Sequence, residues 1–198
     1  MKFRTFARSH RGRVILTAIP VAAAVTLLTS GVAQGAVPVS FAVSGSQFQM
    51  GASLLDGTGF SQYSGVAKDA KGGAHAVAIA NIKSAKLYDL CQAVSADTPL
   101  GKVGVRITAG GGGHPATASD LQIGMTGLKG NATFGHIRIG VDASDVNTTA
   151  KGSVGDFAQD SDTVRIAGVE QTAWSTQASV FTLTGMTVAL TDGSKGCF

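Results

Sequence analysis

The sequence predicts a mainly β protein, built as a single antiparallel β domain after an N-terminal signal helix. Apolar and polar residues alternate with a period of two, β-branched residues gather on one phase of each run, and glycine-rich turns separate the runs. We expect the domain to form a sandwich, a jelly roll or a partly open barrel. A β-solenoid is the alternative, because residues 79–90, 121–134 and 164–174 resemble one another, although without a fixed period.

Residues 1–36 have the layout of a secretory signal peptide. Five of the sixteen Lys and Arg residues precede an apolar run from Val14 to Leu28, and small residues follow from Gly31 to Ala36. The run has only about 15 residues, whereas a membrane-spanning helix needs about 20. We therefore expect cleavage, with retention as an anchor as the alternative. The mature domain, residues 37–198, is then extracellular or associated with the cell surface.

The predicted mature domain is close to neutral. Removing residues 1–36 leaves eleven Lys and Arg against twelve Asp and Glu, a net charge of about −1 in place of the formal +4 of the whole chain. Nucleic-acid binding needs clustered basic residues, and here they are scattered singly from Lys68 to Lys195. We expect no nucleic-acid partner.

Seven strands are expected along the mature domain. Each places β-branched or aromatic residues on one face, as Val103, Val105 and Ile107 illustrate. The strands are predicted over residues 39–43, 48–50, 75–82, 102–108, 137–141, 163–166 and 181–190. In the last of these the apolar phase changes at Gly185, which indicates a bulge or a tight turn.

Glycine-containing turns separate these strands. The turns are predicted at residues 56–57, 71–73, 110–113, 129–131 and 192–193. Long loops are expected from Gly110 to His114 and from Asp142 to Asp162. Helix content should be low outside the signal peptide.

The two cysteines are Cys91 and Cys197. An even number of cysteines in an exported protein favours a disulfide, with two buried free thiols as the alternative. A bond between them would close a loop of about a hundred residues and stabilise the fold by about 4 to 5 kcal/mol in the chain-entropy model. It would fix the C-terminus to the middle of the chain.

The sequence contains no motif that assigns a catalytic residue, a cofactor or a metal ligand. Residues 59–63 depart from the Gly-x-Ser-x-Gly nucleophile elbow at the final glycine, and the glycine clusters lack the strand-to-helix context of a dinucleotide site. His75, His114 and His136 do not have the spacing of zinc ligands. A Ser-His-Asp site that uses one of these histidines is not established by spacing alone.

Other polar and aromatic residues have two interpretations each. We expect His114 to lie in an exposed loop and His136 to lie in a strand, with its ring at the surface or hydrogen-bonded. The aspartates between Asp142 and Asp162 are expected to form turns and carry solvated charges, with a calcium site as the alternative. Trp174 is expected to pack in the core, with a place in a ligand cavity as the alternative.

Six segments carry a resemblance to a known family: residues 35–45, 55–60, 90–91, 131–135, 171–174 and 196–198. Together they resemble an uncharacterised family of exported proteins from high-GC actinobacteria, over almost the whole chain. Members are sometimes labelled cholesterol esterase, a label for which this sequence offers no nucleophile motif. The resemblance implies a cell-envelope setting, and its two cysteine contexts favour the disulfide between Cys91 and Cys197.

Three classes of function follow. The first expectation is a noncatalytic envelope or extracellular protein that binds a lipid or another apolar ligand, without a cofactor. The alternative is a structural or interaction protein of the cell surface, whose partner is an envelope protein. An ester hydrolase follows only from the family label. A lined cavity of a few hundred Å3 would favour the first, a closed packed core the second, and a serine hydroxyl beside a histidine the third.

Overall fold

The computed structural model describes residues 42–43, 45–99 and 101–198. All regular elements in these residues are β-strands, and they join in one sheet whose pairings are almost all antiparallel. None of the described residues belongs to a helix that is long and apolar enough to cross a membrane. The prediction of a mainly β, antiparallel domain is confirmed. The predicted signal peptide, residues 1–36, lies outside the described residues.

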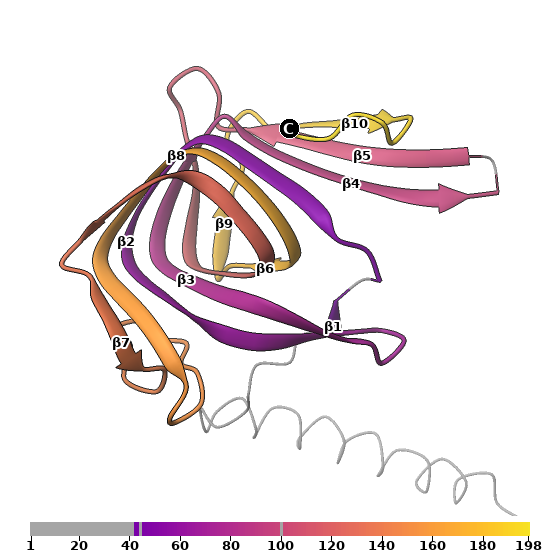
Figure 1. The fold of residues 1–198 in the computed structure, drawn as a ribbon. Coiled ribbons are helices and arrows are strands. Elements are labelled where there is room, and N and C mark those ends of the chain that lie inside the picture. The colour runs from indigo at the N-terminus through magenta and orange to yellow at the C-terminus, as the bar shows by residue number, and fades with distance from the viewer. Residues whose placement is uncertain (1–41, 44, 100) are drawn as a thin grey trace, which may run out of the picture. The chain divides into compact units, whose positions relative to one another are not determined.

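Four long strands form the framework of the domain. They are β2 (Phe48–Asp69), β3 (Ala74–Tyr88), β6 (Ala116–Gly135) and β8 (Phe157–Gln177). β2 pairs with β3, β3 with β6, β6 with β8, and β8 with β2 again, so the four strands close on themselves (Figure 1). We call these four strands the barrel. Among the architectures expected from the sequence, this closed circuit of strands corresponds to the barrel. It does not correspond to the solenoid.

The strands of the barrel are strongly staggered. Around the barrel, Ser64 pairs with Ala78, Ala78 with Met125, Met125 with Ala173, and Ala173 with Phe48. One circuit thus begins at Ser64 and returns to the same strand at Phe48. A large stagger tilts the strands and widens the barrel, since strand number, shear and diameter are linked. Four strands can therefore enclose a core of large side chains.

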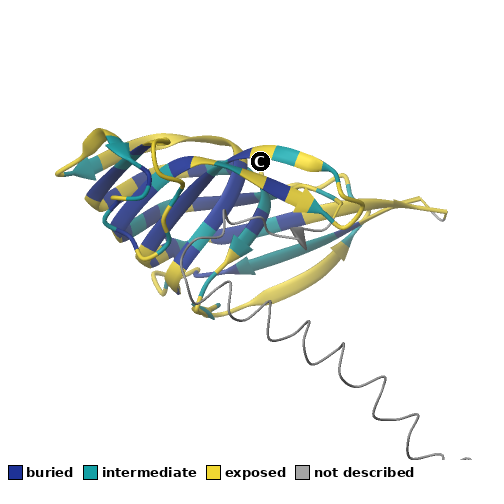
Figure 2. Ribbon diagram, turned by 90° about the horizontal axis from the view of Figure 1, so that it is seen from below, coloured by how far each residue is buried: buried dark blue, intermediate teal, exposed yellow. Residues whose placement is uncertain are grey.

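The interior of the barrel is filled by apolar side chains. Met50, Leu87, Leu121 and Val164 are each at most 1% exposed and belong to one core cluster. Figure 2 shows buried and exposed residues alternating along the long strands, as the two-residue period of a strand requires. The barrel is therefore a packed core.

A three-stranded extension of the same sheet projects from the barrel. It consists of β4 (Leu90–Thr98), β5 (Gly101–Ala109) and β10 (Thr187–Thr191), which we call the flap (Figure 1). β4 continues the register of β3 along the first residues of β2, and Asp89, with a φ of 50°, separates the two strands. Beyond Asp89 the chain pairs with β5 instead of β6. The sheet therefore divides at this residue.

Three short strands complete the structure. β1 (Ala42–Val43) runs parallel to the end of β2, β7 (Arg138–Asp142) pairs with β8, and β9 (Val180–Thr182) pairs with β6. The connection between β7 and β8, residues 143–156, contributes Ala143 and Val146 to a second apolar cluster with Tyr63 and Ile79. This loop is shorter than the predicted one, because β8 already begins at Phe157.

Several predicted strand limits are wrong. The strand predicted at residues 48–50 runs on to Asp69, the strand at 163–166 is part of the much longer β8, and β4 and β6 were not predicted. The turn predicted at residues 56–57 lies inside β2. A Cβ on Gly57 would come within 2.6 Å of Ile82 Cγ2, so this glycine permits close packing across the barrel.

Two other glycines, Gly130 and Gly185, account for two further differences from the predicted elements. The turn predicted at residues 129–131 lies within β6, where the register to β8 shifts between Lys129 and Asn131. The strand predicted at residues 181–190 is divided into β9 and β10. Gly185 lies between them with a φ of 64°, which is the tight turn indicated by the change of phase.

Candidate ligand-binding cleft

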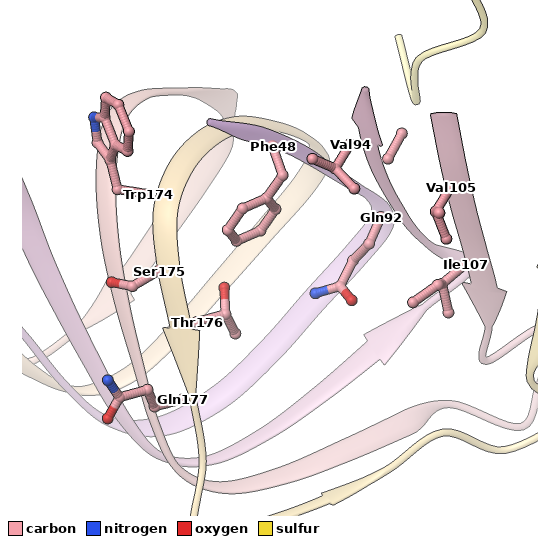
Figure 3. A pocket seen from close by; sticks show the side chains of 10 residues that line it. Phe48, Gln92, Val94, Val105, Ile107, Trp174, Ser175, Thr176 and Gln177 are labelled. Atoms are coloured by element: carbon pink, nitrogen blue, oxygen red, sulfur yellow. The ribbon is translucent and has the colours of Figure 1, made fainter. Parts of the chain in front are cut away.

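A cleft of about 420 Å3 lies between the end of β8 and the flap. β8 brings residues 174–177 to one side, and the other side comes from residues 92–94 on β4 and from Val105 and Ile107 on β5 (Figure 3). Phe48, the first residue of β2, lies between them because it pairs with Ala173 on β8. The division of the sheet at Asp89 thus creates the cleft.

The lining of the cleft is mainly apolar and carries no ionisable group. Ten described residues line it: Phe48, Gln92, Ala93, Val94, Val105, Ile107, Trp174, Ser175, Thr176 and Gln177. Its polar groups are the amides of Gln92 and Gln177, the hydroxyls of Ser175 and Thr176, and the indole N–H of Trp174. Ser175 Oγ and Thr176 Oγ1 are both buried without a hydrogen-bond partner in the described structure. Such a lining suits an uncharged ligand with a long apolar part.

The apolar wall of the cleft continues over one face of the flap. Val105 pairs with Val94 on β4 and with Leu190 on β10, and Ile107 pairs with Val188. Paired residues share a face, so these side chains form one surface together with the cleft wall. Val188 is 55% and Leu190 79% exposed. This face of the flap is therefore an uncovered apolar surface next to the cleft.

The ten described residues that line this cleft all lie in a region that a known family shares. The model of a family of unknown function (DUF6230) matches residues 44–198. The chain belongs to this family. No curated protein and no solved structure matches it. The resemblance to an uncharacterised family is thus confirmed, and the barrel, flap and cleft are features of a DUF6230 domain.

Trp174 of the DUF6230 domain combines the two roles that the sequence left open. It lines the cleft and also packs against the second apolar cluster. The His75 ring stacks on the indole with 3.8 Å between the ring centroids. His75 Nε2 lies 3.0 Å from Asp69 Oδ2. The contact with Trp174 therefore fixes one side of the cleft to the turn between β2 and β3.

Asp69 organises that turn. Its carboxylate contacts His75 and accepts hydrogen bonds from the backbone N–H groups of Lys71 and Gly73, at 2.8 and 2.9 Å. The contact with His75, followed by the two backbone bonds, holds the pKa of Asp69 below its ordinary value. The turn predicted at residues 71–73 is thus present, and the carboxylate that stabilises it also positions His75.

His114 and His136 are not among the residues that line the cleft. His114 is exposed in the loop after β5, as expected. The strand position expected for His136 is wrong, because this residue lies in the bend between β6 and β7; its ring is exposed, as expected, and lies 3.2 Å from Asp162 Oδ2. In residues 45–99 and 101–198, the rings of His75 and His136 contact carboxylates and an indole, not a serine hydroxyl. The same residues include no group of three His, Cys, Asp or Glu that could hold a metal ion.

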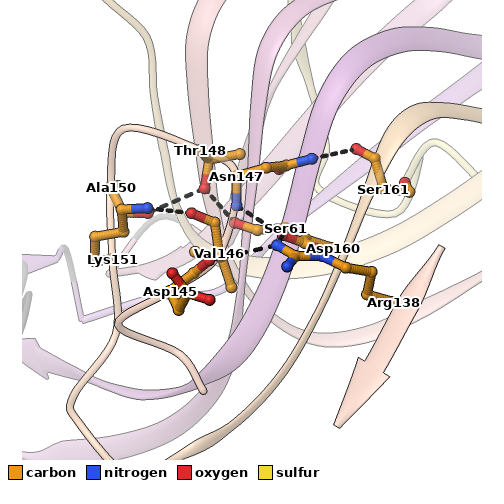
Figure 4. Close-up of polar contacts among 10 residues, drawn as sticks. All are labelled: Ser61, Arg138, Asp145, Val146, Asn147, Thr148, Ala150, Lys151, Asp160 and Ser161. Carbon is orange, nitrogen blue, oxygen red and sulfur yellow. Dashed lines mark hydrogen bonds and ion pairs between the residues drawn. The ribbon is translucent and has the colours of Figure 1, made fainter. Parts of the chain in front are cut away.

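The aspartates between Asp142 and Asp162 have different roles. Asp142 accepts hydrogen bonds from Ser144 and Gly155 and is a turn former, as predicted. For Asp160 the prediction of a solvated charge is wrong, because its side chain is 1% exposed. Arg138 Nε and Nη2 donate to its two oxygens at 2.8 and 2.6 Å, and the backbone N–H of Asn147 donates at 2.7 Å (Figure 4). Asp160 therefore ties the loop to β7 and β8.

A buried polar network underlies the same loop. Ser61 and Thr148 are joined by a hydrogen bond of 2.5 Å (Figure 4), Asn81 donates to Ser61 at 3.1 Å, and Gln122 donates to Asn81 at 2.7 Å. Burial raises the pKa of the neighbouring Tyr63 hydroxyl. This network satisfies polar groups in the barrel wall and lies outside the cleft, so we assign it a structural role.

Cys91 and Cys197 lie at disulfide distance, with their sulfur atoms 2.06 Å apart. The C-terminal segment is also held by Gln49, whose Oε1 accepts a hydrogen bond of 2.9 Å from the Cys197 backbone. Both contacts lie at the base of the flap, where β4 meets β2. The C-terminus thus fastens the flap to the barrel and supports one wall of the cleft.

Among the cleft residues only Trp174 was singled out from the sequence. The alternation of Val103, Val105 and Ile107 was recognised, but it predicts a strand and not a binding surface. The cleft depends on which strands become neighbours, and the division of the sheet at Asp89 has no sequence motif. An aspartate with positive φ is uncommon, and the pattern of residues around it does not predict it.

Proposed function

We propose that this protein is a noncatalytic, exported binding protein that holds the apolar chain of an uncharged amphiphile in the cleft between β8 and the flap. The cleft carries the proposal: its volume of about 420 Å3 falls within the roughly 300–1,000 Å3 of small-molecule sites. An apolar chain that leaves water for this lining gains about 25 cal/mol for each Å2 that it buries.

The lining also supports an uncharged ligand. Its polar groups are two amides, two hydroxyls and the indole N–H of Trp174, and none of the ten described lining residues is ionisable. A carboxylate brought against this wall would lose water without gaining a cationic partner, which is costly. An alcohol or ester oxygen needs only a neutral donor or acceptor. Gln92, Gln177 and Thr176 provide such groups.

Export rests on the signal-peptide layout of residues 1–36. The approach of Cys91 to Cys197 supports it, because disulfides persist in oxidising compartments. We propose no ester hydrolase, since the histidine contacts described above provide no activated serine. The proposed role is retention or transport of the ligand outside the cytoplasm.

Native mass spectrometry of the full chain tests the proposal, with 1-dodecanol as the uncharged probe and dodecanoate as the charged one. The variant Val105→Glu places a charge in the cleft, and Val154→Glu is the matched control on the exposed loop before β8. We expect one bound dodecanol in the unmodified protein and in the control, and none in Val105→Glu. Equal binding by Val105→Glu, or equal binding of dodecanoate, would contradict the proposal.

A further inference from the structure

In the part of the chain that the structure describes, no strand pairs with the outer edge of β10. β10 lies at the end of the strand order and pairs only with β5 among the described strands. After β10 the chain turns back across the flap: a Cβ on Gly193 would lie 3.3 Å from Ser95 Cβ on β4. The C-terminal segment thus leaves the outer edge of β10 free. The backbone N–H and C=O groups of such an edge can pair with another strand.

β10 lacks the features that usually protect an edge strand. Natural edges carry charged side chains, proline or a bulge, which discourage pairing with other chains. The five residues from Thr187 to Thr191 include none of these, and their register to β5 is continuous. Val188 and Leu190 are 55% and 79% exposed on the apolar face of the flap. The edge is thus suited to pairing with a strand of similar chemistry.

The sequence of β10 is almost symmetric about its central residue. Thr187, Val188, Ala189, Leu190 and Thr191 read threonine, aliphatic, alanine, aliphatic, threonine in both directions. We propose that two copies of this protein pair antiparallel through β10, about a two-fold axis at Ala189. A two-fold interface requires a surface that is complementary to itself, and this strand has that property.

The pairing matches each side chain with a compatible one. Val188 of one copy lies opposite Leu190 of the other. Thr187 lies opposite Thr191 in the same way. An aliphatic pair and a threonine pair are both favourable across neighbouring strands. Asp192, the first charged residue after β10, lies opposite Met186 of the second copy and so meets no like charge. The two flaps then form one continuous sheet, and their apolar faces join on the same side.

Cross-linking at Ala189 tests both the pairing and its register. The protein has no free thiol among its described cysteines, so one introduced cysteine reports alone. In the full chain, two Ala189→Cys side chains face each other across the axis, with Cβ atoms about 5 Å apart. Thr187→Cys is the matched control on the same face, where the two copies are about 13 Å apart along the strand. Oxidation is expected to give covalent dimers of Ala189→Cys in a yield at least tenfold higher than that of Thr187→Cys.

Sedimentation velocity separates edge pairing from stacking of the apolar faces. Val188→Lys changes the edge strand, whereas Val103→Lys changes the same apolar face on β5, a strand that is already paired on both sides. We expect a concentration-dependent dimer for the unmodified protein and for Val103→Lys, and a monomer for Val188→Lys. A monomeric unmodified protein, loss of the dimer in both variants, or equal cross-linking of the two cysteine variants would overturn the inference. Since neither lysine variant changes a residue that lines the cleft, these results are independent of ligand binding.

Discussion

Replacing Asp160 with asparagine is expected to lower the free energy of unfolding at pH 7 by about 2 kcal/mol. The carboxylate is 1% exposed and accepts three hydrogen bonds, two from Arg138 and one from Asn147. Hydrogen bonds to a charged group contribute about 1.5–3 kcal/mol each. Asparagine keeps one acceptor oxygen, and the half-exposed Arg138 regains water, so the loss is smaller than that of a fully buried ion pair.

The pH dependence of the free energy of unfolding separates the effect of the Asp160 charge from the effect of its side-chain shape. The hydrogen bonds from Arg138 hold the pKa of Asp160 below its ordinary value, and burial opposes them. A lowered pKa in the folded state stabilises the protein above the unfolded value of about 3.9, and this contribution disappears as the pH falls through the folded pKa. The difference in the free energy of unfolding between the unmodified protein and Asp160→Asn should therefore be largest at pH 7 and should shrink below about pH 4.

Urea unfolding at a series of pH values measures this difference. Trp174 is the only tryptophan in the sequence, so its fluorescence reports the transition. Asp156→Asn is the matched control, because Asp156 lies exposed in the same loop, and we expect it to change stability by less than about 0.5 kcal/mol. A gap between Asp160→Asn and the unmodified protein that stays constant from pH 7 to pH 3 would refute the electrostatic explanation.

Three other perturbations have expected outcomes. Replacing both Cys91 and Cys197 with serine should cost about 4 to 5 kcal/mol in urea unfolding, because the bond closes a sequence separation of 106; no loss would contradict a bonded pair. Gly57→Ala should cost about 1–3 kcal/mol through crowding in the barrel, whereas Gly127→Ala, which has open space, should be nearly neutral. Calorimetric titration should show 1-dodecanol binding about 15-fold more tightly than 1-decanol, at about 0.8 kcal/mol for each buried CH2; equal affinities would argue against burial of the chain.

The sequence predicted the class of fold because alternation with a period of two is a local property. It did not predict the extent of β2 or β6, because glycines inside these strands look like turns. Gly57 allows close approach to Ile82, and Gly130, with a φ of 153°, lies where β6 shifts its register to β8. Each glycine allows close approach to a side chain of a neighbouring strand. Local patterns do not distinguish such glycines from those of a turn.

The cleft was even less predictable. Its walls come from the first residue of β2, from β4 and β5, and from the end of β8, which lie far apart in the sequence. Their approach depends on the register of the barrel and on the division of the sheet at Asp89. Trp174 alone was a candidate, because a single large aromatic residue among small polar ones suggests either a core or a cavity.

Quenching of Trp174 by a brominated ligand tests the proposed function most directly. The titration uses 11-bromoundecanol, an uncharged amphiphile whose bromine quenches an indole on contact, with 1-undecanol as the unbrominated control. We expect saturable quenching in the unmodified protein and in Val154→Glu, and its loss in Val105→Glu, because Val105 lines the same cleft as Trp174. Saturable quenching that is unchanged in Val105→Glu, or no quenching in the unmodified protein, would contradict the assignment of this cleft as the binding site.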